Sequence, residues 1–337
     1  MNAEKGASEE KGQHAERPSQ IPKRGWKEIG SRVMRELTED NISIVSAGVA
    51  YYFFLALFPA LIAAISLYGL VMDPADAEQQ IGQIAQVLPE QATEIVSRFL
   101  QDVAGSEGQT LGWGLILSLL FSFWTAHNGT GAVFEGVNIA YNERDERGFF
   151  KYHGITLLFT LGGIAAGIIC TALVVVFPVM VESLNMPSMV ETLIQWLRWL
   201  LLALIIIGGL GLTYKVGPDR RNPEVRWVTH GSVIATVLWL LGSILFSLYM
   251  DNFGDYDEMY GSFAAVIILM VWFFITAYAI LLGAEINSEM EHQTRTDSTI
   301  GEDKPMGERE AYHADHMPEG DEGKDPDADG AKDTASA

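Results

Sequence analysis

Long runs without a charged residue constrain this chain more than any other feature. Five such runs are 24 to 32 residues long and cover Asn41–Met72, Gly108–Phe134, Tyr152–Val181, Trp227–Met250 and Met259–Ala284. A sixth apolar run, Thr192–Tyr214, carries only Arg198. Each run exceeds the roughly 18 residues that indicate a transmembrane helix. The chain is therefore predicted to be an all-α polytopic membrane protein with a six-helix transmembrane bundle.

These runs exclude several other classes of structure. A bilayer offers no water to backbone amides, so only helices and closed barrels cross it. Barrel strands alternate in polarity over about ten residues, and the runs here do not alternate. Residues 1–40 contain no apolar stretch typical of a cleavable signal peptide, so the first span is expected to act as the insertion signal. The single cysteine, Cys170, excludes an intramolecular disulfide.

The same patterns predict the organisation of the chain. Residues 1–25 are expected to form a disordered tail, and 26–40 an amphipathic interfacial helix, because apolar residues recur there at helical spacing between basic ones. Short amphipathic helices are expected outside at about 79–104. Residues 288–337 hold 15 acidic and 5 basic side chains and are predicted to be a disordered acidic tail. The membrane domain is expected over 41–287, with spans at about 44–72, 110–140, 153–181, 192–214, 227–250 and 261–285.

The distribution of Lys and Arg predicts the orientation. The flank before the first run and the loops around residues 144–151 and 215–226 are rich in basic residues, whereas the other three loops contain only Arg98. By the positive-inside rule both termini are cytoplasmic. The net charge of −21 divides into 0 for residues 1–40, −11 for 41–285 and −10 for the remainder. The acidic outer face either attracts cations or serves solubility in a salty or acidic medium.

The second run contains the most polar segment of any span. Polar groups at membrane depth must find partners in the bundle or line a hydrated cavity, and glycines beside them would permit an unwound turn. Pro59 in the first run is expected to kink its helix, with or without a functional role. We predict a substrate path lined by Pro59, His127, Asn128 and Thr130.

Polar residues also recur at the inner ends of the spans. Counting 1.5 Å per residue from Gln109 places Glu135 about 40 Å along its helix, beyond a hydrocarbon core of about 30 Å. Such residues form either an inner gate or headgroup site, or a purely structural interfacial layer. The predicted cytoplasmic-side polar cluster comprises Glu135, Asn138, Tyr141, His230, Glu285 and Asn287.

Catalytic motifs are scarce. The sequence contains no glycine-rich phosphate loop, no H-E-x-x-H and no G-x-S-x-G. His313 and His316 form an H-x-x-H in the acidic tail, which is weak support for a metal site. We therefore predict no catalytic residues, no metal site and no cofactor.

Several short motifs point to a known family. They include Asn138–Tyr141 and the segment closing the last run, Leu282–Asn287. With these motifs the chain, over about residues 26–290, resembles the YihY/virulence factor BrkB (UPF0761-type) family. The resemblance implies a multi-pass bacterial inner-membrane protein linked to serum resistance, envelope integrity and transport of lipid precursors. The matching residues are Tyr51, Tyr52, Phe58, Pro59, Tyr260, Gly261, Ser262, Trp272, Gly283, Ala284, Glu285 and Asn287.

Together these observations predict a transporter or flippase-like protein for a lipid or other amphiphile. Its expected partners are membrane lipids and a lipid-precursor substrate, with no nucleic acid. The alternative is a non-catalytic envelope scaffold or assembly factor. An old ribonuclease label of the family fits least, because RNA hydrolysis needs a metal-binding cluster or an acid–base pair in a basic groove.

Overall fold

The computed structural model describes residues 11–71, 108–183, 187–221, 223–252 and 263–318. Within these ranges the regular structure is helical, which confirms the all-α prediction there. The expected outer helices at 79–104, and the motif residues Tyr260, Gly261 and Ser262, lie outside them. The long helices are α2 (Lys23–Glu39), α3 (Ile42–Val71), α6 (Gly108–Ala140), α7 (Phe149–Thr171), α9 (Ser188–Val216), α10 (Val225–Asn252) and α12 (Ala264–His292).

Several of these helices have the length and apolar composition of membrane-spanning helices. Four of them, α7, α9, α10 and α12, are long and apolar enough to cross a bilayer, and the bent pair of α2 and α3 would make a fifth span. α6, which contains the polar run around His127, is not among these candidate spans. The chain is thus a membrane protein with several apolar helices, and the expected number of six spans stays a prediction.

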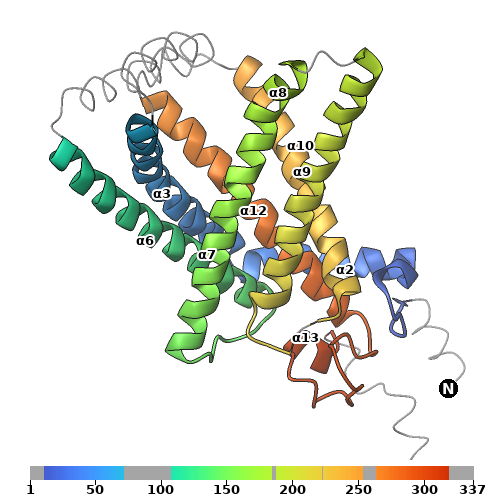
Figure 1. Cartoon of the computed structure of the whole chain (residues 1–337). Helices are drawn as coiled ribbons and strands as arrows, with labels where there is room; N and C mark the ends of the chain where they lie inside the picture. The colour runs from blue at the N-terminus through green and yellow to red at the C-terminus, as the bar shows by residue number, and fades with distance from the viewer. Residues whose placement is uncertain (1–10, 72–107, 184–186, 222, 253–262, 319–337) are drawn as a thin grey trace, which may run out of the picture.

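The helices meet at one end of the molecule and diverge toward the other (Figure 1). α3 packs along α6, and α12 packs along both α3 and α10. We call the meeting point the converging end; α2 and the short helix α13 (Tyr312–Asp315) lie there. Its core contains Val49, Val137 and Leu281, one residue each from α3, α6 and α12. Sequentially distant helices are therefore held together mainly at this end.

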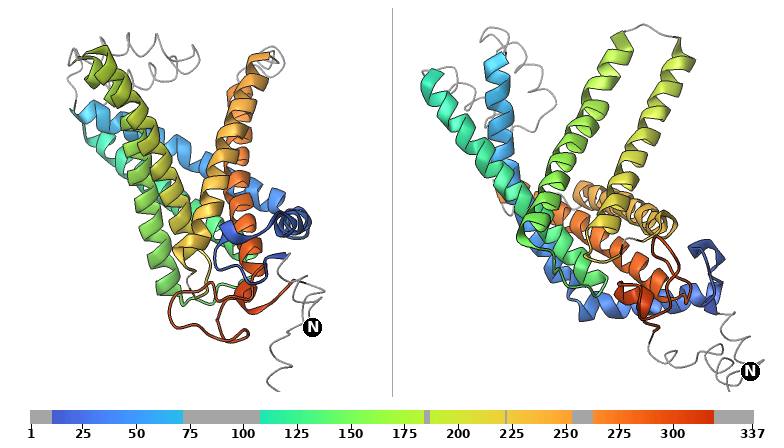
Figure 2. Two further views of the ribbon diagram at one scale, coloured as in Figure 1. Left: turned by 90° about the vertical axis from the view of Figure 1, so that its right-hand side faces the viewer. Right: turned by 60° about the horizontal axis from the view of Figure 1, so that its bottom comes forward.

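α7 and α9 are far less enclosed by protein. They stand side by side in two views (Figures 1 and 2), and only 6% of the apolar window of each is buried. Their large apolar side chains, among them Leu158, Leu161 and Trp196, are exposed. A surface of this kind is stable where lipid takes the place of water.

Two asparagines end helices at the converging end. Asn41 and Asn142 follow α2 and α6 with φ angles of 53° and 52°. This left-handed conformation is a common helix stop, and asparagine tolerates it better than most residues. The chain turns at Asn41, and the bend between α2 and α3 is 64°.

The expected third span is one helical rod with a local change of winding. After α7 comes a π-helical turn, η2 (Ala172–Val176), and then α8 (Phe177–Ser183). Pro178 lies at the start of α8, where it can donate no hydrogen bond and its ring would clash with the carbonyl four residues earlier. The wider π turn is a recognised way to accommodate such a break. α3, by contrast, continues as a single helix through Pro59.

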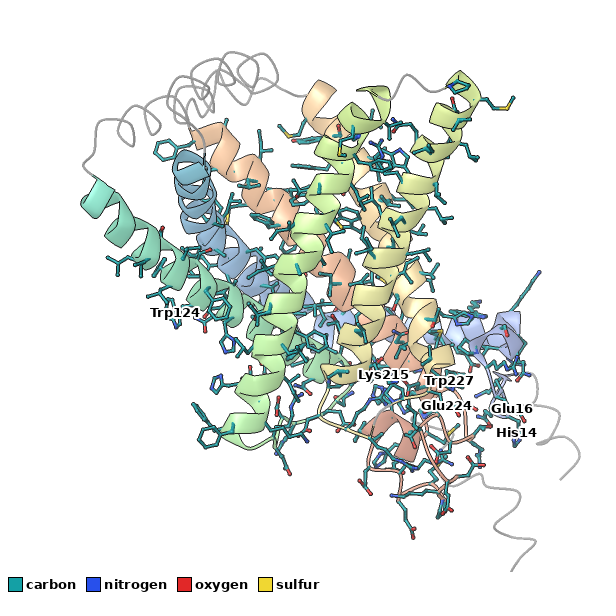
Figure 3. All side chains as sticks on the ribbon, viewed as in Figure 1. His14, Glu16, Trp124, Lys215, Glu224 and Trp227 are labelled. Carbon is teal, nitrogen blue, oxygen red and sulfur yellow. The ribbon has the colours of Figure 1, made fainter. Side chains whose placement is uncertain are left out.

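α2 occupies the region where the sequence predicts an interfacial helix. Its apolar residues Ile29 and Val33 are buried, and they belong to one cluster with Trp227 and Met290. Figure 3 shows Trp227, in the first turn of α10, at the converging end. The apolar stripe of α2 thus packs against α10 and α12, rather than resting on lipid as the pattern suggested.

The segment after α12 differs from the disordered tail expected from residue 288. Thr294 donates a hydrogen bond of 2.7 Å to the carbonyl of Ala15, so the segment also orders part of the N-terminal region expected to be a disordered tail. Arg309 is buried and donates to the carbonyls of Ala314 and Arg295. The acidic composition of this segment predicted disorder, but several of its carboxylates are paired with arginines of the membrane domain. This pairing offsets the free-energy cost of bringing the carboxylates into the folded structure.

Candidate functional site

The converging end contains a buried ion pair between two distant parts of the chain. Arg220, in the connection between α9 and α10, donates hydrogen bonds of 2.9 and 2.8 Å to the carboxylate of Glu291. Both side chains are completely buried. The guanidinium also lies 4.3 Å from the ring centre of Tyr141, a cation–π geometry. This arrangement ties the end of α12 to two loops.

A second set of contacts joins the α6–α7 and α9–α10 connections. The backbone N–H of Asp219 donates to the side-chain oxygen of Asn138 at 2.8 Å. Arg147 pairs with Asp145 and donates to the carbonyls of Val216 and Gly217 at the end of α9. We name Asn138, Tyr141, Asp145, Arg147, Arg220 and Glu291 the inner junction.

Burial and pairing alter the acid–base properties of this junction. Burial raises the pKa of Tyr141 well above its ordinary value. For Arg220 burial opposes the charge, but the facing Glu291 carboxylate outweighs it and the pKa is raised. Burial likewise opposes ionisation of Asp145, yet the hydrogen bonds from Arg147 lower its pKa. At neutral pH these shifts keep Tyr141 a neutral phenol and favour the charged forms of Arg220 and Asp145.

The motif that closes the last span makes close contacts between helices. Tyr214 of α9 donates a 2.7 Å hydrogen bond to the carbonyl of Ile280, and it reaches that carbonyl across Gly283. A Cβ at Gly283 would lie 2.5 Å from the Cβ of Ala235. Only glycine permits this approach.

Asn287 in the same motif joins α12 to the start of α10. Its side-chain oxygen accepts a 2.9 Å hydrogen bond from the N–H of Gly231, and its nitrogen donates to the carbonyl of Val228 at 3.3 Å. Trp272 forms an edge-on pair with Trp239 of α10, and Tyr51 and Tyr52 form another on α3. Of the family motif residues, Gly283, Asn287 and Trp272 therefore make contacts that join α12 to α9 or α10.

The structure divides the expected cytoplasmic-side polar cluster. Asn138, Tyr141, Glu285 and Asn287 are all buried at the converging end, and the carboxyl groups of Asp40 and Glu289 are electrostatic neighbours of Glu285. Glu135 instead has an exposed side chain. His230 is partly buried beside Gly231 on α10. Glu135 therefore does not belong to the buried set, because neighbouring positions of a helix point in different directions and this one points to the outer face of α6.

Two of the residues expected to line a substrate path, His127 and Thr130, contact α7. The Nε2 atom of His127 is 3.1 Å from the Nδ1 atom of His153. Thr130 accepts a 3.0 Å hydrogen bond from Thr160, and Asn128 is partly buried. Pro59 belongs to α3, whose side chains around this position are not among those described. Sequence reasoning therefore located His127 but missed its partner.

The depth of this histidine pair differs from what the linear count suggests. His153 lies in the first two turns of α7, which begins at Phe149. α6 runs obliquely to α7 (Figure 1), so a position well inside α6 meets the beginning of α7. The rings of Phe149 and Tyr152 lie 4.2 and 5.2 Å from that of His153. Such aromatic residues are typical of the boundary between lipid and water.

α6 also presents apolar residues on its outer surface near this pair. Trp124 is exposed and projects away from the bundle (Figure 3). Its ring centre lies 5.6 Å from that of Phe121. The polar pair is thus bordered by a surface suited to lipid chains.

An open cleft of about 760 Å³ lies at the converging end. Its lining is strongly acidic and offers one arginine. It is formed by Asp40, Ile139, Asn142, Glu143, Arg144, Glu146, Asp219, Glu310 and Tyr312. The electrostatic potential of such a surface attracts cations and repels polyanions.

These features define an all-helical membrane protein whose helices are tied at one end by a buried ionic junction. The family model of virulence factor BrkB matches residues 33–307. The chain therefore belongs to the BrkB family, as its motifs predict.

Curated relatives agree with this assignment. YfkH of Bacillus subtilis (strain 168), whose name describes it as ribonuclease-like, is 31% identical over 249 residues, which is 72% of this chain and 88% of YfkH. A UPF0761 membrane protein of Vibrio parahaemolyticus is 26% identical over 77% of this chain and 81% of its own length. Another from Tolumonas auensis is 26% identical over 76% and 83%. No solved structure matches the chain.

Proposed function

We propose that this chain is an inner-membrane transporter or flippase-like protein that moves a lipid or another amphiphile. The observation that carries the proposal is the pair of His127 and His153. It places polar ring nitrogens between two helices whose outer surfaces are apolar. An amphiphile needs this combination, because its headgroup seeks hydrogen bonds while its chains stay in lipid.

One ring nitrogen of the pair lacks a hydrogen-bond partner in the described part of the chain. The Nδ1 atom of His127 is buried and has no hydrogen-bond partner among the described residues. A buried polar atom without a partner costs free energy, which a bound headgroup would recover. Nearby Asn128 supplies a second polar side chain on the same helix. The polar segment of α6 would therefore hold the headgroup while α7 contacts the chains.

Reconstitution in liposomes with fluorescent lipids of several headgroups tests this proposal. The parent protein is expected to accelerate movement between leaflets, measured as the fraction of label protected from a membrane-impermeant quencher. His127→Leu and Asn128→Leu should lower the initial rate by roughly tenfold, as expected when a polar contact worth about 1.4 kcal/mol is lost in the rate-limiting state. His316→Leu is the matched control, because His316 is exposed and distant in sequence.

Two outcomes would count against the proposal. Equal rates in empty and protein-containing vesicles for every headgroup would remove transport and favour an envelope scaffold, for which the docked segment after α12 offers a surface. Parent-like rates in both α6 variants would remove the assigned path. A ribonuclease role is not proposed, because the acidic cleft would repel RNA phosphates.

A further inference from the structure

Three side chains with metal-binding atoms meet at the end of α12. Glu289 and His292 lie in its last turn, and His313 lies in α13. Each offers one ligand atom, and these atoms all lie within 4.8 Å of one another. Glu289 and His313 are buried, and the His292 side chain is 14% exposed. Sequence spacing had instead paired His313 with His316, whose Nδ1 atom lies 2.9 Å from the carbonyl of Tyr312.

The spacing of the three groups resembles a coordination shell more than a hydrogen-bonded cluster. The Nδ1 atom of His292 lies 3.6 Å from a carboxylate oxygen of Glu289, which is beyond hydrogen-bond range. Ligands held about 2.0 Å from a tetrahedral ion are separated from one another by about 3.3 Å. The rings of His292 and His313 lie nearly parallel, with centres 4.5 Å apart. The three ligand atoms are close enough to share one ion once the two imidazole rings turn from this parallel arrangement so that their nitrogen lone pairs converge.

Two of the ligand residues carry buried ring nitrogens without a well-formed hydrogen bond. The Nδ1 atoms of His292 and His313 make no hydrogen bond of normal length and angle among the described residues, although His292 faces Glu289 and His313 faces the backbone of Ser288. Native proteins rarely leave such atoms unsatisfied, and a bound ion is one recognised explanation. A cation that binds at these nitrogens would satisfy both atoms.

The surrounding residues fit a supporting role. Arg32 donates to one oxygen of Glu289, which leaves the other oxygen, Oε1, facing His292. The Nε2 atom of His313 is 3.0 Å from the side-chain amide of Asn142. If His313 binds through Nδ1, its Nε2–H would donate to the Asn142 oxygen after exchange of the two amide positions.

We propose that Glu289, His292 and His313 bind one divalent transition-metal ion of the Zn²⁺ class, which fastens the segment containing α13 to the end of α12. Two imidazoles and a carboxylate match the donors that Zn²⁺ accepts. Mg²⁺ and Ca²⁺ prefer shells of oxygen atoms and fit this set poorly. Because the family model ends at residue 307, the site joins a helix of the family core to a residue beyond it.

Metal analysis of the full-length protein tests the site. Protein purified in detergent is stripped with EDTA, exposed to Zn²⁺, dialysed and analysed for metal content. The parent chain and His316→Ala are expected to retain close to one ion per chain, and His292→Ala and His313→Ala close to none. Co²⁺ bound to the parent should show the absorption of a four-coordinate ion. Size-exclusion profiles identify variants that misfold.

Protease protection provides a second readout. Arg309 is buried in the docked segment, so cleavage after it requires that segment to open. At a Zn²⁺ concentration of about 100 Kd, cleavage of the parent should slow by roughly 100-fold relative to EDTA. His313→Ala should show no difference between Zn²⁺ and EDTA. A folded parent chain that retains no zinc, or a His313→Ala variant that retains it fully, would overturn the proposal.

Discussion

Arg220 and Glu291 are the residues on which the inner junction depends most. Their side chains are wholly removed from solvent, so each has a large desolvation cost that its charged partner offsets. Ser298 adds a 2.9 Å hydrogen bond to the same carboxylate. A pair of this kind adds little net stability over apolar residues, but it is severely destabilising when one member is removed.

Replacing one member of this pair should therefore be costly. Arg220→Met leaves the Glu291 carboxylate buried without its partner, and we expect a loss of about 3–5 kcal/mol in the free energy of unfolding. The measurement is thermal unfolding of the purified protein in detergent.

Two variants control for the length and the charge of the side chain. Arg144→Met changes an exposed arginine in the α6–α7 connection and should leave the melting temperature nearly unchanged. Arg220→Met combined with Glu291→Met should recover most of the loss. A single Arg220→Met variant as stable as the parent would contradict the buried pairing.

At the scale of the elements, α12 organises the bundle. It contacts α2, α3, α6 and α10, and Tyr214 of α9 bonds to its backbone at Ile280. Helices that pack this closely need small residues at the points where their backbones come near one another, as is usual between membrane helices. Gly283 is such a position, whereas Gly208 on α9 has no atom within 4 Å of a Cβ placed on it.

These two glycines allow a matched comparison. Gly283→Ala should destabilise the fold by about 1–3 kcal/mol, because the new methyl group would overlap Tyr214 and Ala235. Gly208→Ala should be neutral or slightly stabilising, since alanine favours helix. Thermal unfolding of both variants gives the comparison, and an equal effect at the two positions would argue against the close packing of α12 on α9 and α10.

Some of this element-scale structure was predictable and some was not. Long apolar runs indicate where α7, α9, α10 and α12 lie, because a helix in lipid must satisfy its own backbone within its own sequence. The apolar stripe of α2 could also be recognised in the sequence, but the surface against which it packs could not. The same sequence pattern is compatible with Ile29 contacting lipid and with Ile29 contacting Met290. Only the proximity of Ile29 and Met290 in the folded chain distinguishes these two arrangements.

At the scale of the whole molecule, the described chain begins and ends at the converging end (Figure 1). The basic residues of the N-terminal flank and of the loops around 144–151 and 215–226 belong to the same end. This agrees with the positive-inside argument and leads us to expect that the converging end faces the cytoplasm.

Labelling of single cysteines tests this orientation and the number of spans. In a Cys170→Ser background, a membrane-impermeant maleimide should react with Glu90→Cys in intact spheroplasts. Glu146→Cys and Glu310→Cys should react only after permeabilisation. Position 90 lies outside the described residues, and its labelling tests the span expected over 44–72. Protection of Glu90→Cys in intact spheroplasts would contradict the prediction that the chain crosses the membrane between the N-terminal flank and position 90.

The membrane class, the helical content and the family could all be inferred from linear sequence, since insertion into lipid depends on the local run of apolar residues and on the charges that flank it. Apart from the expected placement of Asn138 and Tyr141 at one end of the bundle, the pairings of the inner junction and the cluster of Glu289, His292 and His313 could not. Their members are separated by up to about 150 positions along α6, the α9–α10 connection, α12 and the segment beyond it. Such pairings depend on burial and geometry that no local pattern encodes, because a carboxylate looks alike in sequence whether water or arginine surrounds it.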